Sequence, residues 1–354
     1  MASVTVATRL KANGVGVCAT LAVFVAGLLW AKWLPYVAKA AKAQRTRHWS
    51  GSSILKVGGV RAGDGPTWHA ATTFFHAYLG SIWPALVVAL LLSASIQALL
   101  PGSWPARVLN RGRPVSSALA GAVAGMPSMM CTCCAAPVAV TLRRNGVGLP
   151  AAVAYWLGNP LLNPAVLVFL LFVAPWQWTV TRAVVGLAVV LGVGALVGSV
   201  TGGPPATVAA PGDEGGRGPR GFTWALLRLS AILLPEYAVL VLLVGAFRGW
   251  LLAAGQSTHP GGDGFLTGLL VVAVAAIVGT LMVIPTAGEI PILSGLALLG
   301  ASSGTIGALL VTLPAASIPG VAMVARSFGW RATAVTASSV MAAGFLGAAV
   351  LTLL

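Results

Sequence analysis

Residues 114–142 read PVSSALAGAVAGMPSMMCTCCAAPVAVTL, a run of small and apolar residues without a charge. The run is long enough to cross a membrane, because about 20 apolar residues in a helix span the hydrocarbon core. Pro127 and Pro137 interrupt it, and each lacks the amide donor that a continuous helix needs. The stretch therefore predicts a membrane segment that is broken within the bilayer.

The composition of the whole chain excludes a soluble surface. Of 354 residues, 58% are hydrophobic and only 8% are charged, and the mean hydropathy is +0.93. A soluble domain has about a quarter of its residues charged. The net charge of +15 comes from cations that flank apolar runs, as at 39–47 and 107–113, where they meet lipid headgroups rather than nucleic acid. We expect an all-α, multi-pass protein of the cell (inner) membrane, with no nucleic-acid partner, cofactor, metal or soluble catalytic module.

Nine apolar segments have about the length of a membrane span. The first ends on aromatic and basic residues at 30–36, which we expect at the membrane interface. The nine segments are residues 14–36, 75–100, 114–142, 149–175, 178–200, 224–247, 264–286, 304–325 and 331–354.

Matching residues recur at a fixed distance along the chain. One ungapped offset of 154 residues relates Pro137 to Pro291, Gly146 to Gly300, Pro160 to Pro314, and Trp176 to Trp330. We therefore expect an internal duplication, with a first repeat at 75–200 and a second at 224–354. An N-terminal span and basic stretch at 1–74 precede them, and a Gly/Pro-rich linker at 201–223 separates them. The pattern is compatible with parallel or inverted repeats.

Helix breakers cluster at corresponding places in both halves. They lie at 131–137 and 158–164 in the first half, and at 285–291 and 314–319 in the second. Backbone opened at membrane depth must be satisfied by protein or by a water-filled cavity, so paired breaks predict a substrate site between the halves. A kink for packing is the simpler alternative for any single proline. The prolines expected to break helices are Pro137, Pro160, Pro164, Pro291, Pro314 and Pro319.

Three motifs of the first half occur in order: CTCCAAP at 131–137, LRRNGV at 142–147 and NPLLNP at 159–164. Together with GEIP at 288–291, they resemble the signature of the ArsP-like permease family over most of residues 75–354. The resemblance implies a permease, not an enzyme, that exports trivalent organoarsenicals.

Cys131, Cys133 and Cys134 suit a soft, thiophilic ligand. Cys131 and Cys133 point the same way in an unwound segment, whereas Cys131 and Cys134 share a face of a helix. Either pair matches a trivalent arsenical with one organic substituent, which has two exchangeable positions. Another soft metal or metalloid species is an alternative substrate, and a redox-active pair would make the chain a membrane thiol-disulfide oxidoreductase. Packing as a small apolar residue explains Cys18 better than it explains the cluster.

Two acids lie within apolar segments, where a charge is costly and indicates function. Glu236 and Glu289 are therefore candidates for proton coupling, and the alternative is a carboxyl that hydrogen-bonds a neighbouring helix. Asn159, Asn163 and Ser317 can contact substrate or cap the broken helices. The candidate substrate residues are Cys131, Cys133, Cys134, Asn159, Asn163, Glu289 and Ser317.

Overall fold

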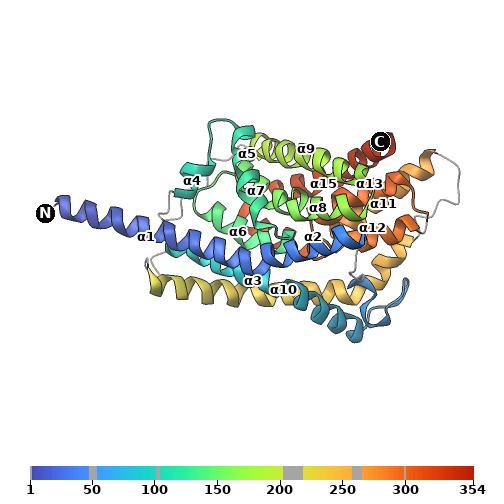
Figure 1. Ribbon diagram of the computed structural model, residues 1–354, viewed down its shortest axis with the longest axis horizontal. Helices are drawn as coiled ribbons and strands as arrows, with labels where there is room; N and C mark the ends of the chain where they lie inside the picture. Colours follow the sequence, from blue (N-terminus) through green and yellow to red (C-terminus); the bar gives the residue numbers. More distant parts are fainter. Residues whose placement is uncertain (1, 48–53, 101–103, 202–217, 257–264, 299) are drawn as a thin grey trace.

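The computed structural model describes residues 2–47, 54–100, 104–201, 218–256, 265–298 and 300–354. Every element in these ranges is a helix, which confirms the all-α expectation (Figure 1). The elements up to the end of the first half are α1 (Ala2–Leu28), the π-helical turn η1 (Leu29–Trp33), α2 (Leu34–Thr46), η2 (Ile54–Gly59), α3 (Trp68–Ala98), α4 (Trp104–Leu109), α5 (Pro114–Gly125), η3 (Met126–Ser128), α6 (Thr132–Arg144), α7 (Leu149–Leu161), α8 (Pro164–Val173) and α9 (Trp176–Thr201).

Several helix bounds in the second half correspond to bounds in the first. Its elements are α10 (Pro219–Gln256), α11 (Phe265–Leu281), α12 (Glu289–Leu298), α13 (Ser303–Ala315), α14 (Ile318–Phe328) and α15 (Trp330–Leu353). An offset of 154 residues carries both ends of α7 onto the ends of α13. The same offset carries the first residue of α8 onto that of α14, and the first residue of α9 onto that of α15.

Within the described ranges, six helical segments are long and apolar enough to cross a membrane: Gly14–Thr46, Trp68–Ala98, Leu149–Val173, Trp176–Thr201, Pro219–Ala253 and Trp330–Leu353. A seventh is counted if α13 and α14, which meet at 52°, form one bent span. The expected count of nine is not confirmed, because residues 114–142 form two short helices and α11 has only 17 residues. Most of the expected linker at 201–223 lies outside the described residues.

Five of the six expected prolines flank helix breaks: Pro160 and Pro314 near the ends of α7 and α13, and Pro164, Pro291 and Pro319 in the first turns of α8, α12 and α14. Pro137 is the exception, because α6 continues through it. The break lies earlier, before Thr132, where Met129 takes a left-handed φ of 50°. A non-glycine residue in this region is uncommon and indicates a tight local constraint.

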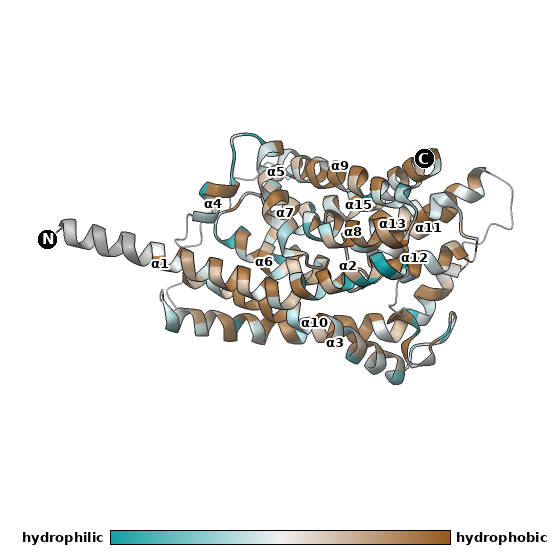
Figure 2. Ribbon diagram, in the orientation of Figure 1, coloured by the Kyte–Doolittle hydropathy of each residue, from teal (hydrophilic) through white to brown (hydrophobic). Residues whose placement is uncertain are grey.

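Helices α3 and α10 pack side by side along one side of the bundle, while α9 and α15 pack together on the opposite side (Figure 1). Apolar residues cover the helices along their lengths (Figure 2). Helices α13 and α15 approach closely, because a Cβ atom on Gly307 would overlap the carbonyl of Gly347. Helices α6, α7 and α13 are almost wholly buried, so their broken ends face protein.

Candidate functional site

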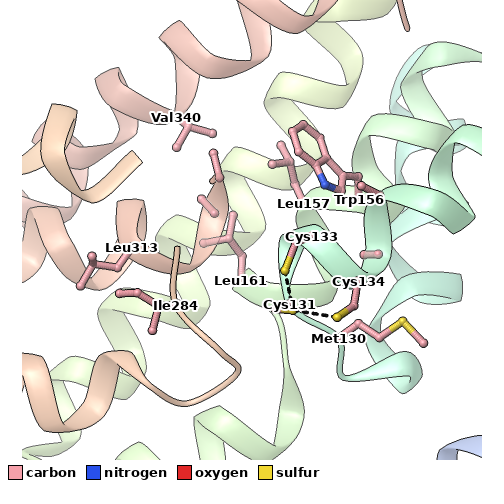
Figure 3. Close-up of a cluster of buried hydrophobic side chains, with 14 of the residues drawn as sticks. Met130, Cys131, Cys133, Cys134, Trp156, Leu157, Leu161, Ile284, Leu313 and Val340 are labelled. Carbon is pink, nitrogen blue, oxygen red and sulfur yellow. Dashed lines mark hydrogen bonds between the residues drawn. The ribbon is translucent and has the colours of Figure 1, made fainter. Parts of the chain in front are cut away.

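The three cysteines expected to bind substrate lie together where α6 begins. Cys131 is the extended residue before the helix, with φ −74° and ψ 166°, and Cys133 and Cys134 lie in the first turn. Cys131 Sγ lies 3.0 Å from Cys133 Sγ and 3.2 Å from Cys134 Sγ (Figure 3). All three are buried free cysteines, and their sulfurs lie within 4.8 Å of one another. Both expected pairings occur at once, because the backbone changes from extended to helical after Cys131.

Two phenols reach the three-thiol cluster from the long helices α3 and α10. Tyr78 Oη lies 3.2 Å from Cys133 Sγ, and Tyr237 donates a longer hydrogen bond of 3.5 Å to the same sulfur. Both side chains are buried, and their ring centroids lie 6.3 Å apart. Because α3 precedes and α10 follows the expected linker, both halves of the chain contact Cys133.

Ser317 connects the second half to the first break. Its Oγ lies 3.1 Å from Thr132 Oγ1. Ser317 also caps α14, because it accepts a hydrogen bond of 3.4 Å from the backbone amide of Gly320. The indole of Trp156 donates to the carbonyl of Thr132 at 2.9 Å. The beginnings of α6 and α14 are therefore held together directly beside the thiols.

Asn159 and Asn163 both have backbone partners at the break between α7 and α8. Asn159 Nδ2 donates to the carbonyl of Tyr155 at 2.8 Å, and its Oδ1 accepts from the amide of Met130 at 3.4 Å. Asn163 Oδ1 accepts from two backbone amides in the first turn of α8, at 3.1 and 3.3 Å. Asn159 thus supports the residue that precedes Cys131, whereas Asn163 is a helix cap.

Glu289 forms a buried ion pair with Arg182, a residue that the sequence analysis did not single out. Arg182 Nη1 lies 2.7 Å from Glu289 Oε1, and the two side chains are 0% and 3% exposed. Arg182 also donates to the carbonyls of Pro160, at 2.7 Å, and Leu161, at 3.3 Å. Because Pro164 has no amide, the Pro160 carbonyl lacks its usual helical donor. One guanidinium therefore satisfies the break after α7 and binds the acid at the start of α12.

The four breaks contact one another crosswise. The break before Thr132 meets the break between α13 and α14 through Thr132 and Ser317. The break at 158–164 meets the break at 285–291 through Arg182, which binds the carbonyl of Pro160 and the carboxylate of Glu289. Each break of one half is therefore in contact with a break of the other half.

The N-terminal helix brings a buried cation to this region, which corrects the expectation of an interfacial cluster at 30–36. Lys32 is 6% exposed and Tyr36 is 8% exposed. Lys32 Nζ donates to Tyr36 Oη at 3.1 Å and to Thr286 Oγ1, in the break before α12, at 3.3 Å. The indole of Trp33 donates to the carbonyl of Pro127 at 2.9 Å. These residues lie in or beside a π-helical turn, a distortion that is frequent at functional sites.

Glu236 has a more exposed environment than Glu289. Its Oε2 lies 3.3 Å from Arg326 Nη1, and the side chains are 19% and 72% exposed, respectively. Exposed pairs of this kind contribute little to stability. The neighbouring Tyr237 is the residue of this stretch that reaches the thiols.

Comparison with known proteins assigns the family. The ArsP_1 family model, described as a predicted permease, matches residues 67–203. UPF0718 protein YraQ of Escherichia coli (strain K12) is 39% identical over 330 residues, which cover 92% of this chain and 91% of the relative. The chain belongs to the UPF0718 family of predicted permeases.

Membership of this permease family confirms the resemblance, and it indicates a transporter with a small-molecule substrate rather than an enzyme. The long apolar helices also indicate a multi-pass membrane protein. UPF0718 protein YcgR of Bacillus subtilis (strain 168) is 32% identical over 116 residues, which cover 32% of this chain and 39% of the relative. No solved structure matches the chain.

Two residues of the permease's buried polar network were missed for different reasons. Arg182 is a single cation within the apolar run 178–200, and the rule that intramembrane charges are functional would have identified it. Lys32 stands among aromatic residues, a composition that is typical of a membrane interface, so composition alone places it wrongly. Only the packing of the N-terminal helix against Thr286 reveals its position.

Proposed function

We propose that this permease exports a small thiophilic solute of the trivalent organoarsenical class from the cell, across the inner membrane, by alternating access. The observation that carries the proposal is the cluster of three buried sulfurs within 4.8 Å of one another. Thiol sulfur selects soft centres over hard ones. The cluster lies where breaks of the two halves meet, which is the usual place of a transporter's substrate site.

Binding is a ligand exchange at arsenic that needs no oxidant. A trivalent arsenical with one organic substituent carries two hydroxyl groups in water. Two thiols displace them, so that two As–O bonds break, two As–S bonds form, and the thiol protons leave with the hydroxyls as two water molecules. Cys131 with either Cys133 or Cys134 supplies the two sulfurs, and the remaining thiol can take over one bond during release.

The proposed architecture is an N-terminal span followed by two repeats of four segments each, at 75–200 and 224–354, with a linker at 201–223. The correspondence of helix bounds at an offset of 154 residues supports the duplication. The crosswise contacts between breaks support it too. The offset relates the break before Thr132 to the break at 285–291, and the break at 158–164 to the break at 314–319, so it converts one of the two contacts into the other. Rocking of one repeat against the other would then open the thiols to each side in turn.

Glu289 and Glu236 are the proposed candidates for proton coupling. Glu289 is the stronger candidate, because it is buried at a contact between the halves. A proton that binds its carboxylate would weaken the pair with Arg182. This would favour separation of the break at 158–164 from the break at 285–291. Glu236 lies beside Tyr237, and through it close to the thiols.

The decisive experiment measures efflux of phenylarsine oxide from cells that carry wild-type or variant protein. Cys131→Ser and Cys133→Ser should each abolish efflux at an unchanged amount of protein in the membrane, because a hydroxyl keeps the size but loses the softness. Cys18→Ser is the matched control, since Cys18 is exposed and away from the cluster, and it should be silent. Full efflux in the Cys131→Ser, Cys133→Ser double variant would refute the proposal.

A thiol-disulfide oxidoreductase is the second candidate, because the sulfurs of Cys131 and Cys133 lie only 3.0 Å apart. Its outcome in the same cells would differ: wild-type protein would leave arsenical accumulation unchanged, and it would oxidise an added dithiol or reduce an added disulfide. A permease for another soft metal would lower accumulation of that metal, again dependent on the cysteines.

A further inference from the structure

Lys32 is a buried cation with neutral partners. Its ammonium donates to Tyr36 Oη and Thr286 Oγ1, and it lies 5.1 Å from the centroid of the Tyr36 ring. These two hydrogen bonds use two of its three donors. Within the described residues the third donor has no hydrogen-bond partner.

The carboxylates of the described residues are engaged elsewhere. Asp64 accepts from the backbone amide of Arg61, Glu236 pairs with Arg326, and Glu289 pairs with Arg182. The other three acids of the sequence, at 213, 214 and 263, lie outside the described residues. A buried charge without a counter-charge costs several kcal/mol, and an anionic group beside Lys32 would reduce that cost.

The surroundings of the thiols also favour negative charge. Lys32 reaches the break before α12 through Thr286, and its neighbour Trp33 donates to the carbonyl of Pro127, in the break that precedes Cys131. Tyr237 donates a hydrogen bond to Cys133, and the cluster lies at the N-terminus of α6, where the helix dipole favours negative charge. Exchange of arsenic hydroxyls for thiols changes no charge, so a neutral arsenical leaves Lys32 without a counter-ion.

We propose that Lys32 determines specificity by binding an anionic group of the substrate. The substrate class is then a trivalent organoarsenical whose organic substituent carries a carboxylate or another anionic oxygen. The sulfurs bind the arsenic while the ammonium binds the anion, from the N-terminal helix rather than from either repeat. This inference rests on the proposed function.

The test compares two arsenicals that differ by one carboxylate group. Phenylarsine oxide and 4-carboxyphenylarsine oxide are titrated against purified full-length protein in detergent, under nitrogen, by isothermal calorimetry. Wild-type protein should bind the carboxylated probe at least about tenfold more tightly, which corresponds to about 1.4 kcal/mol. Lys32→Met should abolish this preference, so that both probes bind with equal Kd, whereas Lys32→Arg should retain the preference.

Lys39→Met is the matched control, because Lys39 also lies over the Tyr36 ring, at 5.8 Å, but is exposed. It should keep the full preference. Equal affinity of wild-type protein for both probes overturns the inference without the need for a folded variant, and it leaves the proposed function standing. A preference that persists in Lys32→Met overturns it too, since another group would then bind the anion. Failure of wild-type protein to bind either probe overturns the proposed function.

Discussion

The buried pair of Arg182 and Glu289 should be the most sensitive polar contact in the protein to single substitution. The two charges lie 2.7 Å apart and are 0% and 3% exposed, and Arg182 also holds the carbonyls of Pro160 and Leu161. The informative variants are Glu289→Gln, Arg182→Met and the double variant Arg182→Met, Glu289→Met.

The expected magnitudes follow from which groups each change leaves unpaired. Removal of one partner of a buried ion pair costs about 3–5 kcal/mol. Glu289→Gln should lower the free energy of unfolding by about 3 kcal/mol, because the amide oxygen still accepts a hydrogen bond and the two carbonyls still bind Arg182. Arg182→Met should lower the free energy of unfolding by about 5 kcal/mol, because it leaves a carboxylate and two carbonyls without a donor. The double variant should cost only about 2, because two apolar side chains replace the pair and only the carbonyls lose a donor.

The free energy of unfolding can be measured by titration of the purified protein with sodium dodecyl sulfate, followed by tryptophan fluorescence. The double variant should be more stable than Arg182→Met alone by about 3 kcal/mol, although it carries a second substitution. A double variant that is less stable than Arg182→Met would refute the reasoning, as would single variants that lie within about 0.5 kcal/mol of wild type. Such values would mean that the charges are hydrated rather than paired.

The same Glu289→Gln variant tests proton coupling. Glutamine mimics the protonated carboxyl and cannot release a proton. If Glu289 couples transport to protons, the variant should bind phenylarsine oxide but lose uphill export and its dependence on the pH gradient. Glu236→Gln is the comparison and should be milder, since Glu236 forms only a partly exposed pair. Unaltered pH-dependent export in Glu289→Gln would contradict the assignment.

Two further predictions concern packing and the thiols. Tyr78→Phe should lower the free energy of unfolding by about 1 kcal/mol in the same titration, because it removes the buried hydroxyl 3.2 Å from Cys133 Sγ; no change would contradict the contact. Gly307→Ala should cost about 1–3 kcal/mol, because its Cβ would overlap the carbonyl of Gly347, whereas Gly192→Ala, with open space around it, should be neutral or slightly stabilising.

The helical class and the positions of the breaks could be predicted because both depend on local chemistry. Apolar runs longer than about 20 residues have few alternatives to membrane helices, and prolines at matching places stop helices at matching places. The span count was less predictable. Residues 114–142 are apolar throughout, yet they divide at Met129, whose left-handed φ of 50° no hydropathy pattern indicates.

The thiols could be predicted because three cysteines within four positions must lie close together whatever the backbone does. Contacts between distant segments could not. Lys32 and Thr286 are 254 positions apart, and nothing in the composition of either neighbourhood indicates the other. The roles of Asn163 and Ser317 could not be decided from the sequence either. Each stands one or two residues before a proline, where a polar side chain is equally typical of a helix cap and of a ligand.

The two halves share helix bounds but differ in chemistry at their breaks. The positions 154 residues after Cys131, Cys133 and Cys134 are Pro285, Ala287 and Gly288, so the second half has no matching thiols. Two similar halves suit alternating access, in which the protein changes between an inward-open and an outward-open state. Recognition of one solute needs only one set of ligands. Substitutions at the helix contacts should therefore change the rate of export without changing substrate preference. Substitutions at the thiols and at Lys32, which lies outside both proposed repeats, should change preference first.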